Sequence, residues 1–183
     1  MAFEQTDKFI RQKAYPVLLS KEAIAKRVSE LGRLISDDYK GKCPILIGVL
    51  NGSFMFCGDL FREISIDCEI DFIKITSYGD DKESSGRVKL RKDVDAHLEG
   101  RHVILVEDIV DSGLSVQYLR TRLSQVAFKS LRFVSLLVKE GAAKVPCHID
   151  YVGFTIPNRF VVGYGLDFAQ RLRNLPEIFL MDG

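Results

Sequence analysis

The first third of the chain alternates between helical and extended spacing of its hydrophobic residues. Apolar residues recur at intervals of three or four over residues 20–38, which predicts an amphipathic helix with Ser20 as its N-cap. The continuous apolar run at 44–50 predicts a buried strand that ends in a turn-forming sequence. A short helix is expected at 56–63, and alternating apolar residues at 69–76 predict a second strand.

The rest of the chain repeats this order after a long polar segment. Residues 77–91 are mostly polar and have little to bury, so they predict a loop, and a loop of this length is usually functional. A strand is expected at 102–106, followed by an amphipathic helix at 115–127. Further strands are expected at 131–138, 151–156, 160–166 and 177–181. Strands that alternate with helices predict an α/β fold with a mostly parallel central sheet flanked by helices.

Length and charge narrow the class of protein. A chain of 183 residues without an evident linker or repeat predicts a single domain, 1–183, with a core of its own. Lys and Arg number 26 against 25 for Asp and Glu, so the chain lacks the basic excess that a nucleic-acid partner usually requires. We therefore expect no nucleic-acid partner.

The cysteines and the N-terminal sequence predict the cellular compartment of the protein. The four cysteines form no CxxC pair, and the three histidines make no zinc-type spacing, which favours free thiols in a reducing compartment. The N-terminus lacks the apolar region of a signal peptide, and the apolar runs are too short for a membrane span. We expect a cytoplasmic protein with no membrane partner.

The junction between the strand at 102–106 and the next helix carries the candidate chemistry. It begins with Glu107 and Asp108 and ends with the small or hydroxyl-bearing residues Ser112, Gly113 and Ser115. A helix N-terminus offers unpaired N–H groups that favour phosphate. Two carboxylates beside a phosphate would repel it unless they bind sugar hydroxyls or Mg²⁺. The segment therefore predicts a sugar-phosphate site with a metal ion.

A simpler interpretation is an acidic loop that leads into a capped helix, since acidic residues and serine are common at helix starts. We favour this interpretation for an isolated Glu-Asp pair, but not for the whole run from strand to helix. The other phosphate motifs, GxxxxGK[ST] and GxGxxG, are absent from the sequence.

The segment from Val103 to Gly113 resembles the signature with which type I phosphoribosyltransferases bind PRPP (5-phospho-α-D-ribose 1-diphosphate). Segments 48–53, 71–78, 135–139 and 152–167 resemble the hypoxanthine-guanine (6-oxopurine) branch in order and spacing. The resemblance covers nearly the whole chain from about Ile45. It implies a type I phosphoribosyltransferase fold with a small hood formed by the N- and C-terminal segments. A mobile lid is expected at about 77–90.

The resemblance also implies an activity. Hypoxanthine or guanine would react with PRPP to give IMP or GMP and pyrophosphate, in a Mg²⁺-dependent purine-salvage reaction with an oxocarbenium-like transition state. Glu107 and Asp108 would hold the ribose hydroxyls directly or through Mg²⁺. Asp111 would act as the general base at the purine N7, although Asp is also common in turns. The implied PRPP-binding set is Glu107, Asp108, Asp111, Ser112, Gly113, Leu114 and Ser115.

The purine site implied by the resemblance draws on the later segments. Lys139 would select a 6-oxopurine through the exocyclic O6, and Phe160 would stack on the ring. Val161 would offer backbone groups, and Asp167 would lie near the purine and bind a second Mg²⁺. Without the resemblance, Lys139 is equally an ordinary strand-end lysine, and Phe160 would be read as a core residue.

The implied pyrophosphate-binding set is Asn51, Gly52, Lys74, Ser77, Tyr78 and Arg173. Asn51 and Gly52 would act through backbone N–H groups, often beside a non-proline cis peptide in this family. The chain departs from the family twice. Relatives often have Lys at the position of Asn51, and they often have Arg in the segment after Lys139, where Lys144 is the candidate replacement.

Two other functions stay open at the level of sequence. One is an RNA-binding regulator built on the same fold, because fold and PRPP signature do not decide function. The other is a transferase for xanthine or a pyrimidine. The resemblance further implies PRPP and a 6-oxopurine as the small-molecule partners, and assembly as a homodimer or homotetramer.

Overall fold

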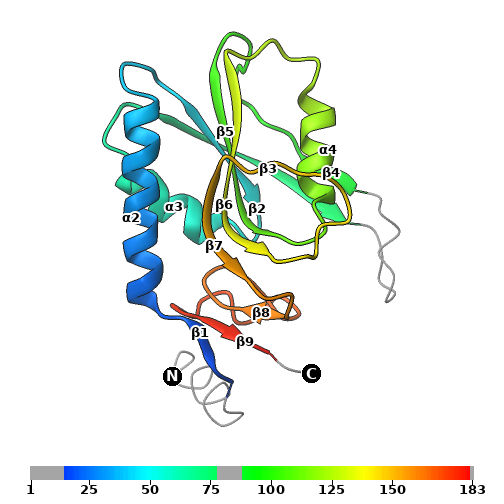
Figure 1. Ribbon diagram of the computed structural model, residues 1–183. Coiled ribbons are helices and arrows are strands. Elements are labelled where there is room, and N and C mark those ends of the chain that lie inside the picture. Colours follow the sequence, from blue (N-terminus) through cyan, green and yellow to red (C-terminus); the bar gives the residue numbers. More distant parts are fainter. Residues whose placement is uncertain (1–14, 78–87, 182–183) are drawn as a thin grey trace.

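A six-stranded sheet forms the centre of the computed structural model, which describes residues 15–77 and 88–181 (Figure 1). The spatial order of the strands is β4-β3-β2-β5-β6-β7. The strands are β2 (Ile45–Leu50), β3 (Glu69–Ser77), β4 (Val88–Lys92), β5 (His102–Val110), β6 (Ser130–Lys139) and β7 (Tyr151–Ile156). The β3–β4 pair is antiparallel and the other neighbouring pairs are parallel, which confirms the predicted mostly parallel sheet.

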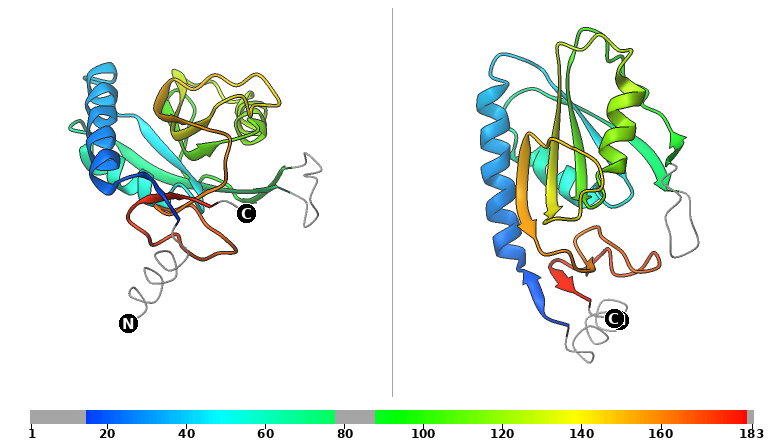
Figure 2. Two further views of the ribbon diagram at one scale, coloured as in Figure 1. Left: turned by 60° about the horizontal axis from the view of Figure 1, so that its bottom comes forward. Right: turned by 45° about the vertical axis from the view of Figure 1, so that its right-hand side comes forward.

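Helices cover both faces of this sheet. Helices α2 (Lys21–Asp38) and α3 (Phe54–Glu63) lie on one face, and α4 (Leu114–Leu123) lies on the other (Figures 1 and 2). Alternate residues of β5 supply the two cores. Val103 and Leu105 pack with the α4 side, whereas the residues between and after them pack with α2 and α3. A strand buried on both faces needs apolar residues at consecutive positions, as the sequence has here.

The predicted N-cap of α2 is confirmed. The Ser20 side chain accepts a hydrogen bond from the backbone N–H of Ala23 at 3.2 Å, which satisfies one of the free donors of the first turn. The buried side chains of α2 recur every three or four residues, as the pattern predicts. Among the described residues, no helix is long and apolar enough to cross a membrane.

A second, three-stranded antiparallel sheet forms the hood. Its order is β1 (Val17–Leu19), β9 (Ile178–Leu180) and β8 (Val161–Val162), so the first and last strands of the described residues lie side by side (Figure 1). The hood faces the carboxyl ends of the central strands. It confirms the hood that the resemblance implies, although the sequence pattern did not predict β1, which is only three residues long.

Several predicted boundaries are wrong. Residues 88–91 of the expected loop belong to β4, which pairs with β3 and packs Leu90 against the α4 core. The strand predicted at 160–166 is only the two-residue β8. Residues 78–87 of the expected lid lie outside the described part of the chain. Strand β5 runs to Val110 instead of ending at Val106, because its last residues pair with β6 as far as Val138. Helix α4 ends at Leu123, four residues before the predicted end.

Candidate active site

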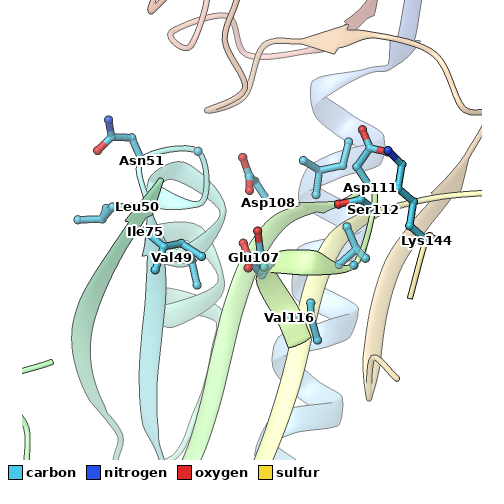
Figure 3. Close-up of a pocket in the computed structure, with 15 residues that line it drawn as sticks. Val49, Leu50, Asn51, Ile75, Glu107, Asp108, Asp111, Ser112, Val116 and Lys144 are labelled. Carbon is cyan, nitrogen blue, oxygen red and sulfur yellow. The ribbon is translucent and has the colours of Figure 1, made fainter. Parts of the chain in front are cut away.

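A pocket of about 470 Å³ opens at the carboxyl ends of β2 and β5 (Figure 3). Its walls come from the turn after β2, the end of β5, and the turn between β5 and α4. Parallel strands bring these turns to one edge of the sheet, where ligands of α/β proteins bind. The polar residues that line the pocket are Asn51, Gly52, Glu107, Asp108, Asp111, Ser112, Gly113, Ser115 and Lys144.

The backbone of the turn between β5 and α4 has a conformation that lets an anion come close to it. Gly113 has a φ of 79°, and a Cβ there would meet Cys147 Sγ at 3.0 Å. The backbone N–H of Lys144 donates to the carbonyl of Ser112 at 3.0 Å and holds the turn from behind. Helix α4 begins at the next residue, so the unpaired N–H groups of its first turn, around Ser115, lie at the pocket wall.

Glu107 and Asp108 form an acidic pair at the pocket, in which Glu107 is buried and Asp108 is partly exposed (Figure 3). Glu107 is 4% exposed, and its Oε1 has no hydrogen-bond partner among the described residues. Burial, with the charge of Asp108 beside it, raises the pKa of Glu107 well above its ordinary value. Burial also raises the pKa of Asp108 to about 6, although backbone N–H groups and the nearby Arg173 oppose the shift.

This acidic pair fits a Mg²⁺ ion that arrives with a ligand. A divalent cation would stabilise both carboxylates in their charged form and would satisfy the free Glu107 oxygen. The described residues contain no cluster of three or more His, Cys, Asp or Glu side chains that could enclose a metal ion. Mg²⁺ is commonly bound by one or two carboxylates together with oxygens of a phosphate ligand, which agrees with this arrangement.

The turn after β2 packs tightly against Asp108. A Cβ on Gly52 would lie 1.6 Å from Asp108 Oδ2, so only glycine fits beside this carboxylate. The peptide bond between Leu50 and Asn51 is cis, in the turn where the resemblance implies such a bond. From the other side, a Cβ on Gly165 would lie 2.1 Å from the Gly52 carbonyl oxygen. The turn is therefore enclosed between β5 and the hood.

Lys139 and Asp111 form an ion pair at the edge of the pocket, which Asp111 lines and Lys139 does not. Lys139 Nζ, at the end of β6, lies 2.7 Å from Asp111 Oδ2 in the turn after β5. The lysine side chain is 10% exposed, whereas the aspartate side chain is 54% exposed. The Asp111 carboxylate is therefore accessible to a ligand, whereas the Lys139 ammonium group is largely covered by the protein.

The hood contributes an exposed aromatic pair. Phe160 is 49% exposed and Phe168 is 51% exposed, and their rings meet edge to face with centroids 6.2 Å apart. Near them, Arg173 pairs with Asp167 at 2.7 Å and donates to the carbonyl of Gly165 at 2.7 Å. The second oxygen of Asp167 accepts the N–H of Gln170 at 2.8 Å. Each Asp167 oxygen thus already has one partner, and a metal ion there would use the remaining lone pairs or replace one of these partners.

Comparisons with known proteins agree with this site. The phosphoribosyl transferase domain family matches residues 17–169. The chain belongs to this family. It is 46% identical over 162 residues to a hypoxanthine-guanine phosphoribosyltransferase of Bacillus subtilis, over 88% of this chain and 90% of that protein. A crystal structure of a hypoxanthine phosphoribosyltransferase from Staphylococcus aureus superposes with a TM-score of 0.89 at 37% identity, covering 94% of this chain and 95% of that one.

A third relative is much longer. The chain is 44% identical over 165 residues to the bifunctional protein TilS/HprT of Listeria innocua, which covers 90% of this chain. The chain spans only 26% of the length of that protein. The similarity therefore concerns one part of the Listeria protein, and the activities of its other parts are not transferred to this chain.

Several predicted site residues do not line this pocket, and they include Lys139, Phe160, Val161, Asp167 and Arg173. Lys74 lies in β3 in register with Leu50, and Leu114 begins α4, but neither lines the pocket. Ser77 is the last residue of β3, and Tyr78 lies outside the described residues. The roles proposed for these residues stay predictions.

Sequence reasoning missed two features of the candidate site. Phe168 follows Asp167 in a segment without hydrophobic periodicity. The one signal that could have indicated it is an aromatic residue next to an acidic one. The direct pairing of Lys139 with Asp111 joins residues 28 positions apart, and no local pattern reports such a contact. The sequence did indicate Lys144, which lines the pocket as the replacement for the family's arginine would.

Proposed function

We propose that this phosphoribosyltransferase is a purine-salvage enzyme that converts hypoxanthine or guanine and PRPP to IMP or GMP and pyrophosphate. The observation that carries the proposal is the pocket itself. It brings a phosphate-binding turn, the acidic pair and the Lys139–Asp111 pair to one edge of the sheet. The similarity to hypoxanthine-guanine phosphoribosyltransferases over most of the chain supports the same activity.

The sugar phosphate would bind along the end of β5. The 5′-phosphate would accept from the first N–H groups of α4 and from Ser112 and Ser115. Glu107 and Asp108 would accept the ribose hydroxyls, directly or through the ion. When bound, Mg²⁺ supplies positive charge that offsets the charge of the pyrophosphate as it leaves.

The purine would bind against the Lys139–Asp111 pair. Its N9 forms the new bond to the anomeric carbon as the bond from that carbon to pyrophosphate breaks. The proton of N7 passes to the Asp111 carboxylate, which is exposed to the pocket. Lys139 would donate to the exocyclic O6. The amino group of adenine would meet this donor with another donor, so the same contact would disfavour adenine.

The remaining roles follow from the hood and the turn after β2. Phe160 would stack on the purine, with Val161 offering backbone groups at its edge. Backbone N–H groups at Asn51 and Gly52, with Arg173, would bind pyrophosphate. Closure of the lid would exclude water from the reacting carbon.

We further propose that the chain forms one catalytic domain that acts in the cytoplasm as a homodimer or homotetramer. The four cysteines are free thiols in the structure, which suits a reducing compartment. Sedimentation velocity would distinguish the two assemblies from a monomer.

The decisive experiment supplies the protein with PRPP, Mg²⁺ and one base at a time. Hypoxanthine, guanine, xanthine, adenine and uracil would be compared, and nucleotide formation followed by absorbance. We expect IMP and GMP to form and the reaction to stop when the metal is chelated. Nucleotide formation only from xanthine or uracil would reassign the substrate. If a folded sample binds PRPP but no base gives nucleotide, the proposal fails. Salt-sensitive retention of RNA on a filter would then identify a regulator.

A further inference from the structure

One buried hydroxyl connects the hood to helix α3. Tyr164 follows β8, is 5% exposed, and donates from its hydroxyl to Asp59 Oδ2 at 2.6 Å. Asp59 lies on α3, the helix that begins directly after the Gly52 turn. Burial, together with the bond to Asp59, raises the pKa of the Tyr164 phenol. The phenol is therefore protonated and able to donate at neutral pH.

The backbone around this tyrosine has an unusual conformation. Gly163, Tyr164 and Gly165 have φ values of 100°, 49° and 99° in succession. A left-handed tyrosine is less stable by on the order of 1–2 kcal/mol and persists only where the surroundings hold it. The backbone N–H of Tyr164 donates to the Leu175 carbonyl at 2.8 Å, and its side chain is held by Asp59. The side-chain bond thus helps to maintain a turn that the backbone alone disfavours.

This turn touches the site through its third residue. Gly165 lies so close to the Gly52 carbonyl that a Cβ would approach the oxygen to 2.1 Å. Gly52 in turn lies against the Asp108 carboxylate. The hood and the segment that carries the Gly52 turn are therefore joined at two points, the Gly165 contact and the bond between Tyr164 and Asp59.

We propose that Tyr164 and Asp59 are positioning residues that fix the distance between the purine platform of the hood and the pyrophosphate turn. The inference rests on the proposed function, in which Phe160 holds the purine while Gly52 and Asp108 lie on the PRPP side. The purine N9 must meet the anomeric carbon at near-contact distance, and a misplacement of about 1 Å lowers the rate about 100-fold. A rigid connection between the two parts therefore affects the rate directly.

The test removes the hydroxyl and keeps the ring. Tyr164→Phe should lower kcat/KM for the purine about tenfold, the effect of losing one hydrogen bond to a charged group. The Kd for PRPP, measured without purine, should change less than kcat/KM, because the proposed PRPP contacts lie mainly on β5 and the β5–α4 turn and only Arg173 comes from the hood. Asp59→Ala should match Tyr164→Phe, and the double variant should be no worse than either. Asp59→Asn keeps an acceptor and should restore most of the activity.

Two variants serve as matched controls. Arg62→Ala removes the exposed ion pair that Arg62 makes with Asp59 but leaves the tyrosine bond, so wild-type kinetics are expected. Tyr151→Phe removes another buried tyrosine's hydroxyl, at the opposite end of the sheet, which donates to Asp38 at 2.6 Å and accepts from Arg132. It should lower the melting temperature about as much as Tyr164→Phe, yet leave kcat/KM unchanged.

The outcomes separate this inference from the proposed function. A wild-type protein that forms no nucleotide refutes the proposed function. An active wild type with a folded, fully active Tyr164→Phe variant refutes the positioning role. Equal losses of activity in Tyr164→Phe and Tyr151→Phe would also refute it, since the effect would then be one of general stability. If Tyr164→Phe does not fold, the Asp59→Ala and Asp59→Asn pair decides the question.

Discussion

Replacing Gly52 with alanine tests whether the turn after β2 sets the place of Asp108. The added Cβ would lie 1.6 Å from Asp108 Oδ2, whereas ordinary contacts begin at 3.4 Å. The carboxylate or the turn must therefore move by about 1.8 Å, the difference between these two distances. A shift of about 1 Å at reacting groups typically lowers the rate about 100-fold, and overpacking lowers the free energy of unfolding by about 1–3 kcal/mol.

We expect Gly52→Ala to lower kcat/KM for PRPP by about 100-fold or more and to weaken PRPP binding. The same change at Gly58 is the matched control. Gly58 lies in α3, and a Cβ there would meet no atom within 4 Å. Gly58→Ala should raise the free energy of unfolding by about 1 kcal/mol, because alanine favours the helix, and should leave the kinetics unchanged.

Initial rates with PRPP varied at saturating hypoxanthine would give kcat/KM, and urea denaturation would give stability. If folded Gly52→Ala shows a kcat/KM within about twofold of wild type, a shift of the Asp108 carboxylate does not limit the reaction. The reasoning from the close contact would then be wrong. A loss of activity in Gly58→Ala would show that α3 is sensitive to any added methyl group.

Three further predictions concern Asp111, Lys139 and Asp71. Asp111→Asn should reduce kcat by about 100-fold or more and change the Kd for PRPP far less, whereas equal losses in both would mark a structural role. Lys139→Ala should reduce discrimination against adenine, measured as the ratio of kcat/KM for hypoxanthine and adenine, and an unchanged ratio would remove Lys139 from the purine site. Burial opposes ionisation of Asp71, but the N–H groups of residues including Asp95 and Ala96 outweigh it and lower its pKa. Asp71→Ala should therefore lower the free energy of unfolding by about 1–3 kcal/mol at pH 7. Because the folded pKa lies below 3.8, this difference is full above that pH and disappears as the pH falls further. A penalty that persists at the lowest pH would contradict the assignment.

The features that could be predicted from sequence are those determined by residues close together in the chain. The helix after Ser20 and the turn from Asp111 to Ser115 are set by neighbouring residues, through a cap and a helix start that follows small residues. The apolar run that became β5 showed a strand buried on both faces. Its end was misjudged because Glu107 and Asp108 are charged, and charge usually marks the end of a buried strand.

The missed features depend on residues far apart in the chain. Strand β4 has five residues, and only its pairing with β3 distinguishes it from a polar loop. The contacts of Gly52 with Asp108 and with Gly165 involve backbone shape, which leaves no periodic signal. The hydrogen bond between Tyr164 and Asp59 joins residues 105 positions apart and could not be predicted from the sequence either. Resemblance to a family supplied the residues of the site, but their mutual geometry required the structure.

The pairing of β1 with β9 also implies an order of assembly during synthesis. Val17 lies opposite Phe179, so the hood sheet is completed only after the central sheet, from β2 to β7, has been synthesised. The β5–α4 turn and its backing at Lys144 and Cys147 are made earlier, and contacts between distant segments form more slowly than local ones. A growing chain would thus acquire its phosphate-binding edge before its aromatic platform. On the proposed function, the pairing of β1 with β9 therefore implies a ribosome-bound intermediate that binds a sugar phosphate before it can bind a base.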